Sequence, residues 1–289
     1  MTEHLTCILC DSNHLKKMIA YQKASLCQCQ SCGLVFSKNV PSKEDLYKFY
    51  NNYGLGSYLS PLTIKRYNEL LDEFESYRKT NKILDVGCGV GYFLDEAKKR
   101  GWEVYGNELS DKAVEVCQNK NINCTLGELD ANNFAEDSFD VITSFEVIEH
   151  MNRPKAEIAA FYKILRKGGL VYLTTPNFNS LLRFRLKSAY NIITFPEHLT
   201  YYTPKTIHKI FKLSGFKKEK IETTGLSLTR FRTSQGKSDQ KIVSEESDDE
   251  KIRIQIDHKW YLKLSKKIIN SLLTFFGVGD SLKARFIKN

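Results

Sequence analysis

A glycine-rich turn follows a short apolar stretch and could bring backbone close to a ligand. The stretch Lys82–Val86 has the pattern of a buried strand and contains Asp85. Two residues later a glycine run begins: Gly87, Gly89 and Gly91. Glycine has no Cβ, so backbone at the carboxyl end of the strand can approach a ligand closely. The G-x-G-x-G spacing differs from the G-x-G-x-x-G of dinucleotide sites, and Asp85 would repel a pyrophosphate but attract a cation.

A second acid, Glu108, stands about 20 residues beyond the glycines, where nucleotide folds bind ribose hydroxyls. It follows a predicted strand at 102–106 and precedes Ser110, a predicted helix N-cap. S-adenosylmethionine combines a ribose with an ammonium and a sulfonium group and carries no phosphate. The two acids and the glycine turn therefore predict a site for this cofactor.

The elements that must position these residues alternate between strands and helices. Such alternation predicts the α/β class, with a parallel sheet, helices on both faces and ligands at the carboxyl ends of the strands. Expected helices cover 62–77, 92–100, 110–120 and 155–166, the last ending at Gly168-Gly169. Expected strands cover 82–86, 102–106, 122–126, 139–145, 170–174, 217–223 and 226–231.

Five segments together resemble the class I S-adenosylmethionine-dependent methyltransferases. They fall between Asn81 and Gly225 and read ILDVGCGVGYFL, GNELS, SFDVITSFEVIEHM, KGGLVYLTTPN and PEHLTYYTP. The most similar subgroup includes bacterial methyltransferases of surface-polysaccharide and secondary-metabolite pathways and the ubiquinone-pathway O-methyltransferases. The resemblance implies a Rossmann-like, mostly parallel sheet of seven strands, closed by an antiparallel strand over residues 279–287.

The same resemblance assigns roles to individual residues. Asp85 and the three glycines would line the methionine part of the cofactor, and Glu108 would hold the ribose. The loop after the third strand would lie along the adenine through Glu128 and Leu129, with Phe145 near the reacting centre. Many relatives carry an aspartate where this chain has Glu128.

Acidic and imidazole side chains gather just after the fourth predicted strand, where they would enter the cofactor cleft: Glu146, Glu149 and His150. His150 could be a general base that takes a proton from an acceptor hydroxyl. Alternatively, these three residues and His198 could hold a divalent ion such as magnesium, manganese or zinc. That arrangement resembles the metal-dependent small-RNA 3′-end methyltransferases. A third interpretation is that Glu149 and His150 only brace their loop.

Five of the eight cysteines lie in the first 32 residues. Cys7-x-x-Cys10 and Cys29-x-x-Cys32 have the spacing of a structural zinc ribbon, in which four thiolates surround the metal. Cys27 could compete with Cys29, but the C-x-x-C-G-L knuckle favours Cys29. Disulfides are disfavoured, because the chain starts without a secretory signal. The remaining cysteines are expected to be buried apolar residues: Cys88, Cys117 and Cys124.

The composition divides the chain into three expected regions. These are a zinc-ribbon module at 1–40, a helical connector over the cofactor at 41–79, and a methyltransferase domain at 80–289 with a flexible insertion at 232–258. The ribbon would be a folding or substrate-docking module, as in similar methyltransferases of the sugar and polysaccharide type. Its alternative use is to dock RNA.

Two stretches, 181–187 and 259–276, combine basic and apolar residues. We expect the first to form a solvated helix, with a membrane surface or an anionic substrate as alternative contacts. We expect the second to pack against the chain's own sheet, with peripheral membrane binding as the alternative. No apolar run reaches the roughly 18 residues that span a bilayer, so the expected location is cytoplasmic, at most peripheral at the inner membrane.

Together these features predict an S-adenosylmethionine-dependent methyltransferase. The expected reaction is O-methylation of a small, nucleotide-linked or lipid-linked sugar in bacterial surface-glycan synthesis. The net charge of +9 suits anionic lipid, nucleic acid or a phosphorylated substrate alike. One alternative is an RNA methyltransferase, although the ribbon has few aromatic residues to stack on bases and we do not expect nucleic-acid binding. The other is an inactive zinc-ribbon binding protein, against which Asp85 and the glycines argue.

Overall fold

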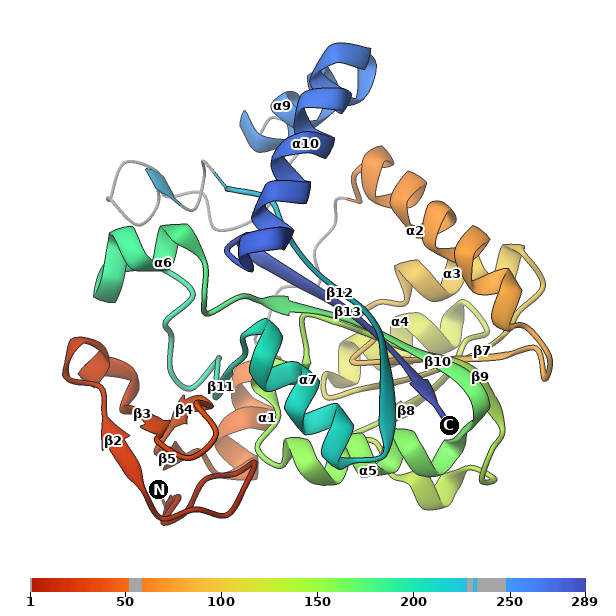
Figure 1. Cartoon of the computed structure of the whole chain (residues 1–289). Helices are drawn as coiled ribbons and strands as arrows, with labels where there is room; N and C mark the ends of the chain where they lie inside the picture. The colour runs from red at the N-terminus through yellow and green to blue at the C-terminus, as the bar shows by residue number, and fades with distance from the viewer. Residues whose placement is uncertain (1, 52–58, 228–230, 233–247) are drawn as a thin grey trace.

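The computed structural model describes residues 2–51, 59–227, 231–232 and 248–289. Its centre is one large sheet with helices on both faces (Figure 1). In spatial order the strands of this sheet are β12 (Phe216–Thr224), β13 (Ser281–Lys288), β10 (Leu165–Pro176), β9 (Phe139–Phe145), β6 (Lys82–Val86), β7 (Glu103–Glu108) and β8 (Asn123–Leu126).

Strand direction puts the carboxyl ends of five neighbouring strands on one edge of the sheet. From β10 to β8 every neighbouring pair is parallel, whereas β13 runs antiparallel to both β10 and β12. Ligands of parallel α/β sheets bind outside this edge. The predicted fold class, a seven-stranded and mostly parallel sheet closed by an antiparallel strand, is confirmed.

Helices cover both faces of the sheet, as a parallel sheet requires. One face packs against α2 (Pro61–Phe74), α3 (Tyr92–Lys99) and α4 (Asp111–Asn119). The other packs against α5 (Pro154–Ile164) and α7 (Pro204–Leu213). On this second face the rings of Phe211 and Phe286 stack with their centroids 4.0 Å apart. The amphipathic helices therefore bury the apolar side chains of both faces.

Two expected boundaries differ from the structure. Helix α5 ends at Ile164, and Leu165 already belongs to β10. Gly168 and Gly169 lie inside β10, where the pairing with β9 shifts register, and Gly168 has a φ of +69°. These glycines mark a strand irregularity and not a helix end. The strand expected at 226–231 is wrong at Leu226 and Ser227, which are in no strand, and at Phe231, which is helical; residues 228–230 lie outside the described residues.

The N-terminal module is joined to the rest of the chain by strand pairing. Its strands are β1 (Thr2–Glu3), β2 (Leu15–Lys17), β3 (Leu26–Cys29), β4 (Val35–Ser37) and β5 (Asn39–Val40). Strand β11 (Thr200–Tyr201), which comes from far along the chain, extends the β2–β3–β4 sheet by pairing with β4. Phe36, opposite Thr200, is fully buried. The module is therefore held against the segment that follows β10.

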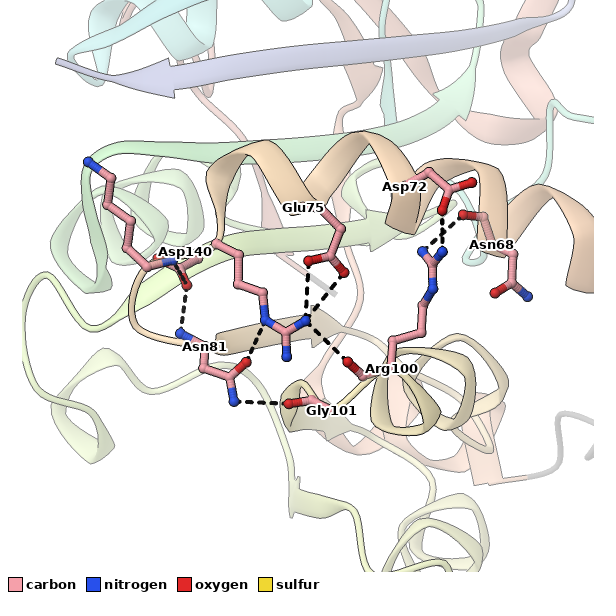
Figure 2. A network of polar contacts seen from close by, with 9 residues as sticks. Asn68, Asp72, Glu75, Asn81, Arg100, Gly101 and Asp140 are labelled. Atoms are coloured by element: carbon pink, nitrogen blue, oxygen red, sulfur yellow. Dashed lines mark hydrogen bonds and ion pairs between the residues drawn. The ribbon is translucent and has the colours of Figure 1, made fainter.

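A polar network fixes the C-terminal end of α2 to the sheet (Figure 2). Arg78 donates from Nε to Asn81 Oδ1 at 2.7 Å and from Nη1 to the carbonyl of Arg100 at 3.1 Å. The Asn81 amide donates to the Gly101 carbonyl at 2.9 Å, and its backbone N–H donates to Asp140 Oδ2 at 2.8 Å. These contacts fix α2 beside α3 and the start of β6. The opposite end of α2 is thereby directed to the edge where ligands bind.

Asp140 is expected to be a large contributor to stability. It is fully buried, and it accepts hydrogen bonds from Arg166 Nε at 2.5 Å and from the backbone N–H of Lys79 at 2.8 Å. Burial opposes ionisation, but the Arg166 guanidinium and backbone N–H groups hold the pKa of Asp140 below its ordinary value. In Asp140→Ala the Arg166 cation is left without its carboxylate, so the free energy of unfolding should fall by about 3–5 kcal/mol. Urea unfolding measures this change.

The matched control is Asp72→Ala, which removes an exposed carboxylate that pairs with Arg100. Exposed pairs contribute little, so the expected loss is below about 1 kcal/mol. Similar losses in the two variants would contradict the importance of the buried pair. Because the pKa of Asp140 is lowered, its contribution should be present above about pH 4, the ordinary pKa, and disappear as the pH falls further.

Two helices between β12 and β13, α9 (Asp248–His258) and α10 (Trp260–Phe276), project from the sheet (Figure 1). The expected flexible insertion at 232–258 is thus helical in its last eleven residues, 248–258, and its residues 233–247 lie outside the described residues. Helix α10 contacts its own sheet, as expected: Leu273 is buried, and the Thr274 hydroxyl donates to the carbonyl of Thr223 in β12 at 2.9 Å. Most of its large apolar side chains are nevertheless exposed. None of the helices in the described residues is long and apolar enough to cross a membrane.

Candidate active site

The glycine turn after β6 has a backbone that other residues could not adopt without strain. Gly87, Gly89 and Gly91 have φ values of +69°, +53° and +77°. A Cβ on Gly87 would lie 2.6 Å from Val147 Cγ2, and one on Gly91 would lie 2.7 Å from Ile122 Cδ1. A Cβ on Gly89 would meet nothing within 4 Å, so space for a ligand lies beside this glycine.

Asp85 lies beneath this turn and is 3% exposed. Its Oδ1 accepts a hydrogen bond of 2.7 Å from the hydroxyl of Thr143. Burial raises the pKa of the Asp85 carboxyl to about 7, against the opposing effect of that hydroxyl. A nearby cation favours the ionised carboxylate. A positively charged ligand above the turn would therefore stabilise Asp85 in its charged form.

Glu108, at the end of β7, links the ends of two adjacent strands. Its Oε2 accepts from the backbone N–H of Gly89 at 3.0 Å. Its Oε1 accepts from the N–H of Leu109 at 2.7 Å and of Ser110 at 3.0 Å. The carboxylate thus lies against the glycine turn, as its predicted contact with a cofactor ribose requires.

The predicted adenine loop follows β8 and is fixed to β7. The Gly127 N–H donates to the carbonyl of Glu108 at 2.8 Å, and the Asn107 amide donates to the carbonyl of Gly127 at 3.0 Å. Glu128 is exposed, whereas Leu129 is half-buried against the core. The structure brings this loop to the expected edge, and the contact of Glu128 with adenine stays a prediction.

An aromatic cluster surrounds Phe145 at the end of β9. Its ring centroid lies 5.0 Å from that of Phe93, 5.7 Å from that of Tyr172 and 5.8 Å from that of Tyr67. Tyr67 belongs to α2 and was not among the residues predicted for the site. Burial, together with the Asp85 charge, raises the pKa of Tyr67 to about 12, so its hydroxyl keeps its proton. The repeated tyrosines of the connector gave no signal that singled out Tyr67.

Two histidines and a glutamate meet just beyond β9. Glu149 is buried and accepts from the Thr175 hydroxyl at 2.9 Å. His150 and His198 lie with their ring centroids 4.8 Å apart. One ligand atom from each of these three residues lies within 4.8 Å of the others. The structure therefore brings together three of the four residues predicted for a second metal site.

Glu146 is the predicted residue that does not join this cluster. It is exposed, with a φ of +55°, and lies outside the metal-type groups found among the described residues. Its backbone N–H donates to the carbonyl of Thr174 at 3.0 Å. The structure therefore groups three of the four predicted ligands, and the Glu146 carboxylate lies outside this group.

Backbone carbonyls orient both imidazole rings. His150 Nδ1 lies 2.5 Å from the carbonyl oxygen of Glu197, and His198 Nδ1 lies 2.8 Å from that of Ile192. A carbonyl only accepts hydrogen bonds, so each Nδ1 carries the hydrogen and each Nε2 keeps its lone pair. His150 Nε2 lies 3.9 Å from Glu149 Oε1. Burial lowers the pKa of His150, so the ring is neutral at pH 7 and can accept a proton or bind a cation.

Comparison with known proteins decides the family. Residues 57–221, more than half of the chain, match the family described as "Methyltransferase domain". The chain belongs to this family.

Among curated relatives, the ubiquinone biosynthesis O-methyltransferase of Idiomarina loihiensis is 32% identical over 136 residues, which cover 44% of this chain and 53% of the relative. That of Pseudomonas fluorescens (strain Pf0-1) is 32% identical over 105 residues, covering 34% of this chain and 45% of the relative. The chain thus spans about half the length of the curated relatives it matches.

Solved structures share the fold at lower identity. An S-adenosylmethionine-dependent methyltransferase from Archaeoglobus fulgidus matches with a TM-score of 0.53 and 20% identity, covering 86% of this chain and 100% of that one. Phosphoethanolamine N-methyltransferase 2 of Haemonchus contortus, solved with S-adenosylhomocysteine, matches with a TM-score of 0.56 and 20% identity, covering 88% and 61%. The chain therefore combines a methyltransferase domain with the fold of S-adenosylmethionine-dependent methyltransferases.

The N-terminal module of this methyltransferase brings four cysteines together. Sγ atoms of Cys7 and Cys32 lie 3.5 Å apart, those of Cys10 and Cys29 lie 3.6 Å apart, and all four lie within 4.8 Å of one another. A zinc tetrahedron with Zn–S bonds of about 2.3 Å has S···S edges of about 3.8 Å, so the donor set fits zinc. Cys27 instead donates to the carbonyl of Phe36, and its exclusion from the cluster agrees with the choice of Cys29.

The other three cysteines are buried beneath the cofactor turn, as predicted. Cys88 Sγ lies 3.6 Å from Cys124 Sγ and 4.0 Å from Cys117 Sγ. A Cβ on Gly106 would lie 2.6 Å from the Cys88 sulfur, so the glycine of β7 leaves room for it. These thiols therefore help to pack the residues beneath the glycine turn.

Proposed function

We propose that this methyltransferase transfers the methyl group of S-adenosylmethionine to a hydroxyl oxygen of a small acceptor. The observation that carries the proposal is the neutral imidazole of His150, held beside Glu149 and His198 at the carboxyl end of β9. The loop that holds Glu149 and His150 touches the glycine turn through Val147. The curated relatives named as O-methyltransferases support an oxygen acceptor.

His150 would act as the general base. The acceptor oxygen attacks the sulfonium methyl, a C–O bond forms, the C–S bond breaks, and S-adenosylhomocysteine leaves. The hydroxyl proton passes to His150 Nε2, whose lone pair is fixed by the hydrogen bond from Nδ1 to the Glu197 carbonyl. General-base catalysis contributes about 10²–10⁴-fold, and correct alignment of the reactants contributes about 7–11 kcal/mol.

The same three side chains also fit a divalent cation. A carboxylate and two imidazoles suit magnesium, manganese or zinc, and both rings have the Nδ1–carbonyl contacts that typically orient histidine ligands. When bound, such an ion would supply positive charge that makes an acceptor hydroxyl more acidic. This hypothesis differs from the base hypothesis in requiring His198 as much as His150.

We infer that the acceptor is a sugar carried on a nucleotide or a lipid, of the kind used in surface glycans. The segment after β10 supports this inference. It lies beside the cluster, where Asn177, Tyr190, His198 and Tyr201 surround, with Glu149, a cavity that has room for about one water molecule. The acceptor itself would therefore bind outside this cavity, against the segment. The N-terminal module holds this segment in place through β11, so it would shape the acceptor site.

The acceptor can be identified with methyl-labelled cofactor. The purified protein is incubated separately with nucleotide sugars, a lipid extract and RNA, and each pool is analysed for label. We expect label in an alkali-stable methyl ether in the nucleotide-sugar or lipid pool. Label in RNA, together with salt-sensitive RNA binding that is lost when the module is deleted, would replace this proposal with the RNA alternative.

Zinc in the N-terminal module is proposed as a structural ion, since a module this short buries too little apolar surface to fold alone. Replacing both Cys7 and Cys32 by serine should reduce bound zinc from about one ion per chain to none, as measured by elemental analysis. Cys27→Ala is the matched control and should keep its zinc, because Cys27 lies outside the cluster. Equal zinc contents in the two variants would contradict the assignment.

A further inference from the structure

One face of α10 exposes a continuous row of large apolar side chains. Trp260 and Phe275 are 75% and 82% exposed. Residues that recur every three or four positions lie on the same face of a helix. The row consists of Trp260, Leu264, Ile268, Leu272, Phe275 and Phe276, each more than half exposed. Contiguous apolar patches on a protein surface typically mark a contact with a partner or a membrane.

Helix α6 (Leu181–Leu186) extends this apolar surface, although it is distant in the sequence. The N–H of Leu181 donates to the carbonyl of Val278, just past the end of α10, at 3.0 Å. The amides of Asn177 and Asn179 donate to the carbonyl of Gly277 at 3.0 and 3.1 Å. Helix α6 itself exposes Leu181 and Phe184. The fold thus places the two basic, apolar stretches of the sequence next to one another.

The charged residues within the two stretches have one sign. Residues 259–276 and 181–187 together contain seven lysines and arginines and no aspartate or glutamate. Burial, and then neighbouring cations that include Arg66, lower the pKa of Lys266 in α10 and of Lys283 in β13. The acid nearest to these helices in sequence, Asp257, already pairs with Lys65 and Lys263. Positive charge therefore accumulates beside the apolar row.

We propose that α10 and α6 rest on an anionic lipid bilayer. An apolar helix face beside lysines and arginines complements a membrane with negative headgroups. A second copy of the chain fits less well, because face-to-face packing would bring like charges together. Each buried apolar side chain and each lysine near the headgroups adds to the affinity.

This surface adjoins the edge of the sheet that carries the active site. Strand β10 ends at Pro176 and leads into α6, and Pro176 pairs with Ser281, the first residue of β13. A bilayer against α6 and α10 would therefore lie beside the proposed acceptor site. If the proposed O-methyl transfer holds, the acceptor is lipid-linked. Membrane binding is measured without methyl transfer. A failure of the membrane proposal can therefore be distinguished from a failure of the proposed O-methyl transfer.

Tryptophan fluorescence reports directly on this face. The chain has two tryptophans, and Trp102 is 3% exposed whereas Trp260 is 75% exposed. Vesicles that contain phosphatidylglycerol should shift the emission to shorter wavelength and carry the protein upward in a flotation gradient. Vesicles of phosphatidylcholine alone should do neither. Raising the salt concentration should weaken the binding.

Paired variants separate lipid binding from folding. Replacing both Leu272 and Phe275 by serine, or both Lys266 and Lys267 by glutamate, should weaken binding to anionic vesicles at least tenfold. The matched control replaces Lys16 and Lys17 of β2 by glutamate, which makes the same change in net charge on the N-terminal module, and should bind as the unaltered protein does. Affinity for S-adenosylmethionine, measured by calorimetry, should be the same in all of them.

Three results would overturn the proposal. The first is no spectral shift with anionic vesicles. The second is vesicle binding that is unchanged in the Leu272 and Phe275 variant. The third is emission from Trp260 that is already shifted to shorter wavelength without lipid. If light scattering then shows a dimer, the face binds a second copy of the chain. If it shows a monomer, another segment of this chain covers the face.

Discussion

Replacing Asp85 by asparagine is expected to weaken S-adenosylmethionine binding by about two orders of magnitude and to stabilise the unliganded protein at about pH 8. Removal of one partner from a buried charge contact typically costs about 2–5 kcal/mol, and each 1.4 kcal/mol is about tenfold in affinity. Asparagine keeps the shape of the side chain and can still accept from the Thr143 hydroxyl, which bonds to Asp85 at 2.7 Å.

The stability gain follows from the direction of the pKa shift. The pKa of Asp85 is raised to about 7 in the folded protein, whereas an unfolded aspartate has a pKa of about 3.9. A carboxyl with a raised pKa favours folding fully below about pH 4, and this contribution is lost as the pH rises through about 7. Asparagine does not ionise, so it avoids the cost of burying a charged carboxylate. At about pH 8 the free energy of unfolding of the Asp85→Asn variant should therefore exceed that of the natural protein by a few kcal/mol.

Titration calorimetry can test the predicted affinity and the predicted ionisation of Asp85, and urea unfolding at about pH 8 can test the stability gain. At about pH 6.5 cofactor binding to the natural protein should release protons into the buffer, because a bound cation favours the Asp85 carboxylate. The Asp85→Asn variant should lack this release. Asp95→Asn is the control, since that carboxylate pairs with Lys120 at 2.8 Å and should leave affinity unchanged. Undiminished affinity in the Asp85 variant would refute the assignment of the cofactor site.

Replacing His150 by asparagine is expected to reduce kcat by about 10²–10⁴-fold with little change in cofactor affinity. The ring is neutral because burial lowers its pKa, and Nε2 is its proton acceptor. The rate of the natural protein should therefore be constant from about pH 7 to 8 and fall below the ordinary histidine pKa of about 6.5. Single-turnover kinetics with labelled cofactor gives the rate of the chemical step.

Three further variants decide how His150 acts. If His150 is only a base, His198→Asn should reduce kcat far less than His150→Asn. If a cation is bound, the His150→Asn, His198→Asn and Glu149→Gln variants should each lose activity and cation affinity together. Glu146→Gln should resemble the natural protein, because Glu146 lies outside the cluster. Full activity of a correctly folded His150→Asn would reject both mechanisms and leave a bracing role.

The fold and the conformation of the glycine turn were predictable because their signals are local. Strand β6, the glycine turn and Glu108 lie within 27 consecutive residues, Lys82 to Glu108, and their patterns depend on backbone geometry that neighbouring residues determine. The glycines at positive φ are a clear case, since no other residue fits there without strain. The four-cysteine cluster was predictable for the same reason. The two cysteines of each Cys-x-x-Cys pair are only three positions apart, so their spacing is also a local signal.

Features that depend on distant contacts could not be read from the sequence. Tyr67 reaches the site only because α2 is fixed to the sheet through Arg78 and Asn81. Strand β11 has two residues, too short a pattern to predict, and forms because β4 offers an edge. The left-handed φ of +55° at Glu146 is likewise a conformation that no propensity of glutamate predicts.

The orientation of α10 is a further case. Its periodic apolar residues predicted the helix correctly, but periodicity does not say what the apolar face meets. The buried Leu273 and the exposed Phe275 belong to the same run of apolar residues. The sequence therefore specifies an amphipathic helix, and only the tertiary fold distinguishes a core face from a surface available to lipid.

A crystal structure with S-adenosylhomocysteine bound is the most direct test of how this protein holds its cofactor. We predict ribose hydroxyls on the carboxylate at the end of β7, the amino group above Asp85, and the sulfur directed toward the loop of His150. A nucleoside bound elsewhere, or a diphosphate seated on the glycine turn in its place, would contradict the account.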